Sequence, residues 1–103
     1  MKAKPITQIQ EGINRRFFIA LKAIIGLGWV SSLESFCKEF GLTPSRYREL
    51  RLTFGVTPNP NSKLSRYKYV EQEALYGLCT KYGVSAEWLL LGRGKMLKNE
   101  TNR

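Results

Sequence analysis

The sequence predicts an all-α fold: one compact domain of five helices. Apolar residues recur at spacings of three and four, and serine, threonine or glycine stands where helices would begin and end. Almost no stretch shows the apolar–polar alternation of a strand. The chain has 103 residues, which suffices for one hydrophobic core. We expect a flexible arm over residues 1–10, a folded domain over residues 11–97 and a frayed tail over residues 98–103.

The first predicted helix runs from about Glu11 to Leu27. Its apolar residues form one stripe at helical spacing: Ile13, Phe17, Ala20, Leu21, Ile24 and Gly28. The pair Arg15-Arg16 ahead of an apolar run also resembles a twin-arginine export signal, and the run itself resembles a membrane anchor. We favour an amphipathic core helix, because Lys22 interrupts the run and the run is shorter than the ~20 residues that cross a bilayer.

The second predicted helix covers about residues 32–40. Ser31 and Glu34 have the spacing of a capping box, in which each side chain pairs with the backbone amide of the other residue. Gly41 follows the helix as the expected left-handed stop.

The third predicted helix covers residues 43–54. Thr43 is a suitable N-cap, and Pro44 fits the first helical position, where its missing N–H leaves no hydrogen bond unmade. Gly55 marks the end of this helix.

The remaining chain predicts a long loop over residues 56–68 and two more helices. The fourth helix covers residues 69–82, stops at Gly83, and repeats apolar residues four apart: Val70, Ala74, Leu78 and Tyr82. Ser85 caps a short fifth helix over residues 86–91.

Residues 33–51 fit the pattern of a helix-turn-helix. This motif needs a small residue where its helices cross, a glycine in the turn and apolar residues on both inner faces. Cys37 and Gly41 meet the first two needs. The apolar set is Phe36, Phe40, Leu42, Tyr47 and Leu50. The alternative is an ordinary αα-hairpin with a glycine in its turn.

The face of the third helix opposite the apolar set suits the major groove of DNA. Arg48 lies on this face and Arg46 and Arg51 flank it, and arginine can pair bidentately with guanine. Ser45, near the helix start, can reach a base edge or a phosphate. A merely solvated polar face is the alternative for any one of these residues.

Arg66 and Lys68 alternate with tyrosines just before the fourth helix. We expect both cations to contact phosphates, which position a protein on the duplex without reading its sequence. The alternative is a loop anchored by its tyrosine rings, with the charges left in solvent.

These segments together resemble the lambda-repressor-like (phage repressor, Xre-type) helix-turn-helix family, over roughly residues 11–97. The resemblance rests on residues 33–51 and on residues 81–96, where a Gly-Val-Ser turn leads into Trp-Leu-Leu and a Gly-x-Gly exit. It implies a five-helix DNA-binding domain, usually dimeric, that controls transcription of phage or mobile-element genes. On the matching positions it implies DNA contacts from Thr43, Pro44, Ser45 and Arg48.

The charge balance points to a polyanionic partner. The chain has 17 Lys and Arg against 8 acidic residues and a formal charge of +9, which favours nucleic acid or an anionic membrane surface. It contains no His and no Asp, so the commonest metal ligand and the Ser-His-Asp arrangement are missing. We therefore expect no catalytic residue, metal, cofactor or small-molecule substrate.

Cysteine usage and the fifth helix bear on location and assembly. Cys37 and Cys79 are expected as buried thiols in a reducing cytoplasm, with a redox switch or metal site as the alternative.

Three residues, Trp88, Leu89 and Leu90, make the fifth helix apolar almost all round, which predicts a homodimer seam there. The alternative is that this helix only closes the core beneath the first helix.

The sequence thus predicts a cytoplasmic, sequence-specific regulator of transcription, a repressor of a phage or mobile element, that binds double-stranded DNA as a homodimer. The alternative is a helix-turn-helix module or accessory factor that binds another protein without sequence-specific DNA binding. Three apolar residues on or near the expected reading face favour that alternative: Leu33, Pro44 and Leu52.

Overall fold

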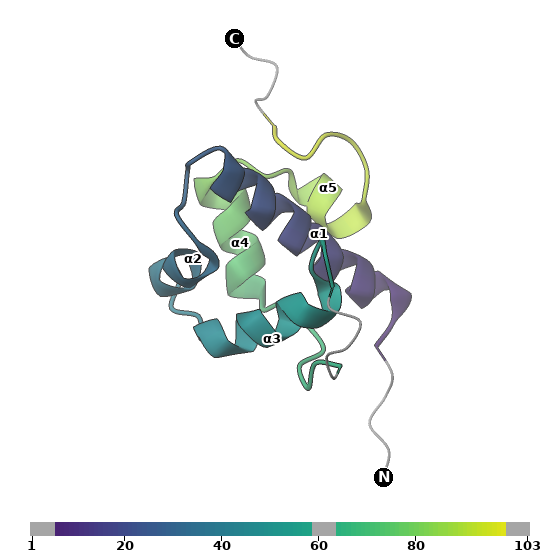
Figure 1. Cartoon of the computed structure of the whole chain (residues 1–103). Helices are drawn as coiled ribbons and strands as arrows, with labels where there is room; N and C mark the ends of the chain where they lie inside the picture. The colour runs from purple at the N-terminus through teal and green to yellow at the C-terminus, as the bar shows by residue number, and fades with distance from the viewer. Residues whose placement is uncertain (1–5, 59–63, 99–103) are drawn as a thin grey trace.

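The computed structural model describes residues 6–58 and 64–98, and this part of the chain is helical without any strand. The helices are α1 (Gln8–Gly26), α2 (Leu33–Glu39), α3 (Pro44–Phe54), α4 (Gln72–Lys81) and α5 (Ala86–Leu91). The predicted all-α class and the five predicted helices are confirmed. Figure 1 shows α1 running through the middle of the molecule, with α2 and α3 on one side of it and α5 on the other.

α1 is the central element of the core and packs against α3, α4 and α5. Its inward residues are buried: Asn14, Phe17, Phe18, Ala20, Leu21 and Ile24. The amphipathic interpretation of this helix is confirmed. No helix in the described ranges is both long enough and apolar enough to cross a bilayer.

α1 begins earlier than its sequence pattern indicates. Thr7 is the N-cap, and its hydroxyl accepts a hydrogen bond from the Gln10 amide at 3.0 Å. The predicted arm over residues 1–10 is therefore too long, because its last three residues are helical. Residues 1–5 of that arm lie outside the described residues.

α2 and α3 are joined by a tight turn at Gly41, which has a φ of 69°. The N-cap of α2 is Ser32, whose hydroxyl accepts from the Ser35 amide at 3.0 Å, so the cap lies one residue after the predicted Ser31 and pairs with Ser35 instead of Glu34. α3 begins at Pro44 as predicted.

The core between these helices is aromatic. Phe36, Cys37, Tyr47 and Leu50 are completely buried, as the pattern of the α2–α3 pair predicts, and the Phe17 ring lies 5.8 Å from Phe36 and 5.7 Å from Tyr47. One face of α3 is therefore buried in the core.

Hydrogen bonds connect α5 to α1, and they connect the turn before α5 to the last described residue of the chain. The Arg16 guanidinium donates to the carbonyl oxygens of Leu89 and Leu90 at 2.8 and 3.1 Å, which satisfies groups at the C-terminal end of α5. The Lys98 amide donates to the Gly83 carbonyl at 3.0 Å, so Lys98 belongs to the fold and not to the predicted tail. Residues 99–103 lie outside the described residues.

Candidate nucleic-acid interface

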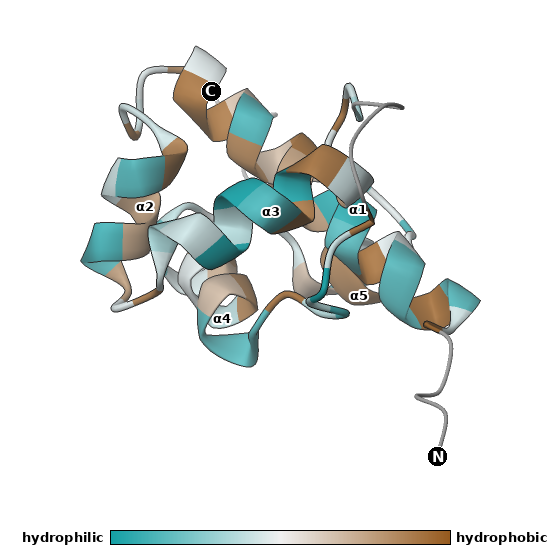
Figure 2. Cartoon of the chain, turned by 60° about the horizontal axis from the view of Figure 1, so that its bottom comes forward, coloured by the Kyte–Doolittle hydropathy of each residue, from teal (hydrophilic) through white to brown (hydrophobic). Residues whose placement is uncertain are grey.

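α3 has one buried face and one open face. Tyr47, Leu50 and Phe54 point into the core. The residues exposed on the other side are Ser45, Arg48, Arg51 and Leu52. Figure 2 shows α3 crossing the front of the molecule, with hydrophilic residues along the side nearest the viewer. The structure therefore leaves three of the predicted contact residues, one serine and two arginines, on an uncovered helix face.

The start of α3 is also open. Thr43 is exposed and its side chain makes no capping hydrogen bond, while Pro44 is half-buried at the first helical position. The backbone amides of a helix start carry partial positive charge, which favours an anion such as phosphate.

Arg48 is held by an ion pair with α2. Its Nη1 donates to Glu34 Oε2 at 3.1 Å, and about half of each side chain is exposed. The pKa of the Glu34 carboxyl lies below its usual value, first because its own backbone amide donates to the carboxylate and then because Arg48 does. This exposed pair is screened by water and salt, so an approaching phosphate can compete with Glu34 for Arg48.

A strap, residues 64–71, replaces the first part of the predicted fourth helix. The sequence spacing predicts helix from residue 69, but α4 begins at Gln72. The reason is that side chains hold the strap in an extended course. Buried Asn14 of α1 donates to the Lys68 carbonyl and accepts from the Val70 amide, both at 3.0 Å. On the α3 side, the Glu71 amide donates to the Tyr47 hydroxyl at 2.9 Å.

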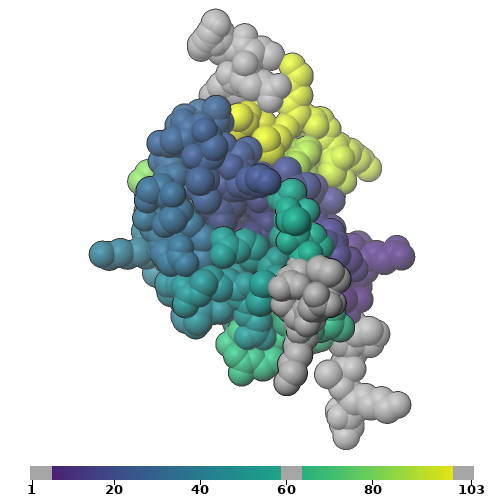
Figure 3. Space-filling view, viewed as in Figure 1, coloured from purple at the N-terminus to yellow at the C-terminus, as the bar shows by residue number. Residues whose placement is uncertain are grey.

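The strap lies beside α3 along most of its length. The Ser65 amide donates to Thr53 Oγ1 at 2.8 Å, and the Arg66 amide donates to Glu49 Oε2 at 2.7 Å. Figure 3 shows the teal surface of α3 meeting the green surface of the strap at the lower edge of the molecule. The predicted contact residues of α3 and of the strap are thus brought together on neighbouring elements.

Arg46 is mostly enclosed by the strap, unlike the exposed Arg48 and Arg51 of the same helix. Only 19% of its side chain is exposed. Its guanidinium lies over the rings of Tyr67 and Tyr69, 4.5 and 5.1 Å from their centroids, and donates to the Tyr69 carbonyl at 3.1 Å. Its Nε also lies 3.8 Å from Glu71 Oε1 and has no hydrogen-bond partner in the described part of the chain. Arg46 holds the strap.

Arg66 and Lys68 are exposed on the strap. Arg66 pairs with Glu49, its Nη2 lying 2.9 Å from Oε1, while 77% of its side chain remains in solvent. The hydrogen bonds from the Arg66 side chain and amide hold the pKa of the Glu49 carboxyl below its usual value. Tyr67 between the two cations is half-buried and anchors the strap against Arg46. The strap is thus anchored by a tyrosine, as one sequence interpretation expects, while its charges remain accessible.

The cysteines lie away from this surface. Cys37 is fully buried, and burial raises the pKa of its thiol to about 11. Cys79 of α4 is half-buried. In the described ranges, no three Cys or Glu side chains lie together in a way that could hold a metal ion.

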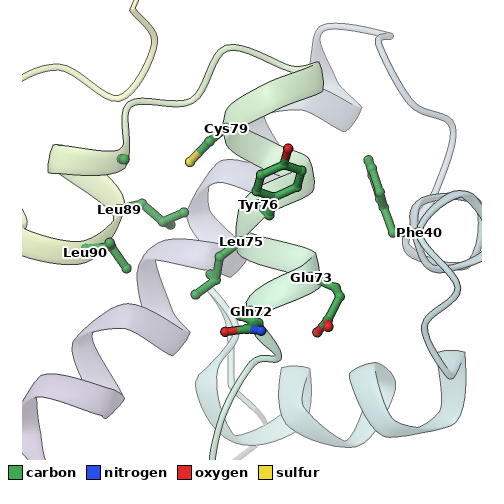
Figure 4. A pocket seen from close by; sticks show the side chains of 9 residues that line it. Phe40, Gln72, Glu73, Leu75, Tyr76, Cys79, Leu89 and Leu90 are labelled. Atoms are coloured by element: carbon green, nitrogen blue, oxygen red, sulfur yellow. The ribbon is translucent and has the colours of Figure 1, made fainter.

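The three residues predicted to form a dimer seam on α5 differ in their exposure. Leu89 is fully buried in the core beneath α1, and Trp88 is half-buried, but 43% of Leu90 and 61% of Leu91 are exposed. Leu90 lines an apolar groove of about 750 Å³ between α4, α5 and the end of α2, to which exposed Tyr76 contributes (Figure 4). No lining residue comes from α3, so the groove and the α3 face are separate surfaces.

The chain was compared with family models, with curated proteins and with solved structures. None of the three comparisons gives a match. Function is therefore argued from the geometry of α3 and the strap, together with the sequence pattern of the α2–α3 pair.

Proposed function

We propose that the protein is a transcriptional regulator that binds double-stranded DNA in a sequence-specific way, with α2 and α3 as its helix-turn-helix. The observation that carries this proposal is the open face of α3, where Ser45, Arg48 and Arg51 are exposed while the opposite face is buried. An exposed, cationic helix of 11 residues has the shape and charge to enter a major groove. The order of the five helices agrees with the resemblance to the lambda-repressor-like family.

The contact residues divide into two groups. Arg48 and Arg51 point outward from α3 and are suited to guanine edges, and Ser45 near the helix start is suited to a base edge or a phosphate. Arg66 and Lys68 of the strap are suited to phosphates, which supply affinity and register without sequence information. The regulator acts in the cytoplasm and represses transcription of a phage or mobile element by occupying its operator.

The proposal includes a homodimer. Its seam is the exposed part of α5 with the groove beside it, Leu90, Leu91 and Tyr76, because these apolar side chains remain in solvent in the single chain. Two copies would present their α3 helices to half-sites about 34 Å apart, one turn of the duplex.

Selection of duplexes from a random pool, followed by fluorescence anisotropy at several salt concentrations, tests the proposal. Each chain of the proposed dimer brings exposed Arg66 and Lys68 to phosphates, which makes four phosphate-binding cations in the complex. If each neutralises one phosphate, affinity should fall roughly 150-fold between about 50 and about 200 mM salt, because bound counterions are released. Failure to enrich any sequence would contradict specific binding.

A second candidate function is docking of another protein on the same side of the molecule. It is favoured by Leu52 and Val56, which are 42% and 49% exposed and line a cleft of about 280 Å³ with Phe18 and Leu21 of α1. Apolar docking would change little across the same salt range, so the anisotropy titration separates the two functions.

A further inference from the structure

We propose that Arg46 is a positioning residue for DNA binding: it clamps the strap against α3 and so sets where Lys68 meets the phosphates. This inference rests on the proposed function. It assigns to Arg46 a role that needs no contact between its guanidinium and DNA.

The surroundings of Arg46 differ from those of Arg48 on the same helix. Arg48 has one exposed partner, Glu34, and about half of its side chain is in solvent. Arg46 has Tyr67 and Tyr69 against its guanidinium, the Tyr69 carbonyl as acceptor, and only 19% of its side chain exposed. Arginine over aromatic rings is attracted by their negative faces, and this attraction grows as water is excluded.

Moving Arg46 out to a phosphate would undo all of these contacts together. The Tyr69 carbonyl would lose its donor, and the Glu71 carboxylate, 35% exposed, would lose the nearby positive charge. The Glu71 carboxylate would keep its hydrogen bond from the Tyr47 hydroxyl, but removing the cation beside a partly buried carboxylate and the donor of a carbonyl is unfavourable. The geometry therefore keeps Arg46 in the clamp when the α3 face is occupied.

The clamp acts beside the exposed Lys68 of the strap. Lys68 lies between the two tyrosines that touch Arg46, and Asn14 holds the Lys68 carbonyl from the side of α1. Asn14 ties this part of the strap to α1, and Arg46 ties it to α3. Since Arg46 joins the strap to the helix that enters the groove, it sets the distance between phosphate contacts and base contacts.

The test is a double-mutant cycle between Arg46→Met and Lys68→Ala, measured as affinity for a duplex selected by the wild-type protein. Methionine keeps an unbranched apolar chain between the tyrosine rings but removes the charge and the hydrogen bond to Tyr69. If Arg46 positions Lys68, each single change should weaken binding about 10-fold and the double variant should be hardly weaker than either one. The base preference of Arg46→Met should stay that of the wild type.

Arg48→Ala combined with Lys68→Ala is the matched control. Arg48 and Lys68 contact DNA independently in this scheme, so their losses should multiply, to about 100-fold for two 10-fold effects. Amide hydrogen exchange by NMR gives a second readout of the clamp. The Val70 and Glu71 amides should exchange about 10-fold faster in Arg46→Met, while those of α1 keep their rates.

Two results would overturn the inference when the wild-type protein binds DNA. If the losses of affinity caused by Arg46→Met and Lys68→Ala multiply in the double variant, Arg46 contacts DNA itself. Wild-type affinity of the folded Arg46→Met protein would mean that the clamp serves stability alone. Failure of the wild-type protein to bind any duplex would instead refute the proposed function, and the inference with it, before any variant is made.

Discussion

Replacing Arg48 by alanine tests the assignment of a base-reading residue to α3. Arg48 stands on the open face of the helix, and its only ion pair among the described residues is the exposed one with Glu34, at 3.1 Å. An exposed pair contributes little to folding, so the unfolding temperature of Arg48→Ala should stay close to that of the wild type. Any loss of DNA binding can then be read as a loss of contact.

The size of the loss follows from the contact that Arg48 can make. A bidentate pair between arginine and guanine is worth about 1–3 kcal/mol, which corresponds to roughly 5- to 150-fold in Kd. Arg48 must first leave Glu34, so the effect should lie toward the lower end of this range. Glu34→Gln should act in the opposite direction and tighten binding, because it frees Arg48 and removes a negative charge near the DNA backbone.

Fluorescence anisotropy with two labelled duplexes measures these effects: one duplex selected from a random pool and one with its bases scrambled. Arg48→Ala should weaken binding to the selected duplex more than to the scrambled one. Arg93→Ala is the matched control, since it removes the same charge from an exposed residue beyond α5. Equal weakening on both duplexes, or wild-type affinity for the selected one, would refute base reading by Arg48.

Three further predictions concern the fold that supports this face. Tyr47→Phe should lower the free energy of unfolding by about 1–2 kcal/mol in urea titrations. The change removes a buried hydroxyl that donates a hydrogen bond to the Glu71 carboxylate and accepts one from the Glu71 backbone amide. Gly55→Ala should destabilise by roughly 1–3 kcal/mol in thermal unfolding, because a Cβ there would lie 2.5 Å from the Arg51 carbonyl oxygen; an unchanged midpoint would contradict this packing. Cys37 should resist iodoacetamide at pH 8, because its pKa is raised to about 11 by burial, and mass spectrometry should find the half-buried cysteine of α4 modified first.

Local signals predicted most of the helices. Ser85, Pro44 and Gly41 act through the backbone within a few residues of their own positions, and each stands where the structure begins or ends a helix. Helical spacing likewise identified the buried face of α3, because a period of 3.6 residues sets which side chains share a face whatever their neighbours are.

Errors arose where a distant residue competes with a local preference. Residues 69–71 have helical spacing, but buried Asn14 and Tyr47 bind their backbone and hold it extended, so α4 starts at Gln72. The apolar pattern of α5 does not distinguish Leu89 from its neighbours, and only the position of α1 shows that this leucine is interior.

The amino-acid sequence by itself determined the helical class, the limits of most helices, the net positive charge and the cationic character of α3. Only the tertiary structure decided which arginines remain available. Arg46 and Arg48 are two residues apart on one helix, yet Arg46 is taken up by Tyr69, 23 residues away, while Arg48 keeps an open face with a partner on α2. The physical reason is that helix propensity and capping are set by near neighbours, whereas the burial and pairing of a charge depend on segments that meet only when the chain is folded.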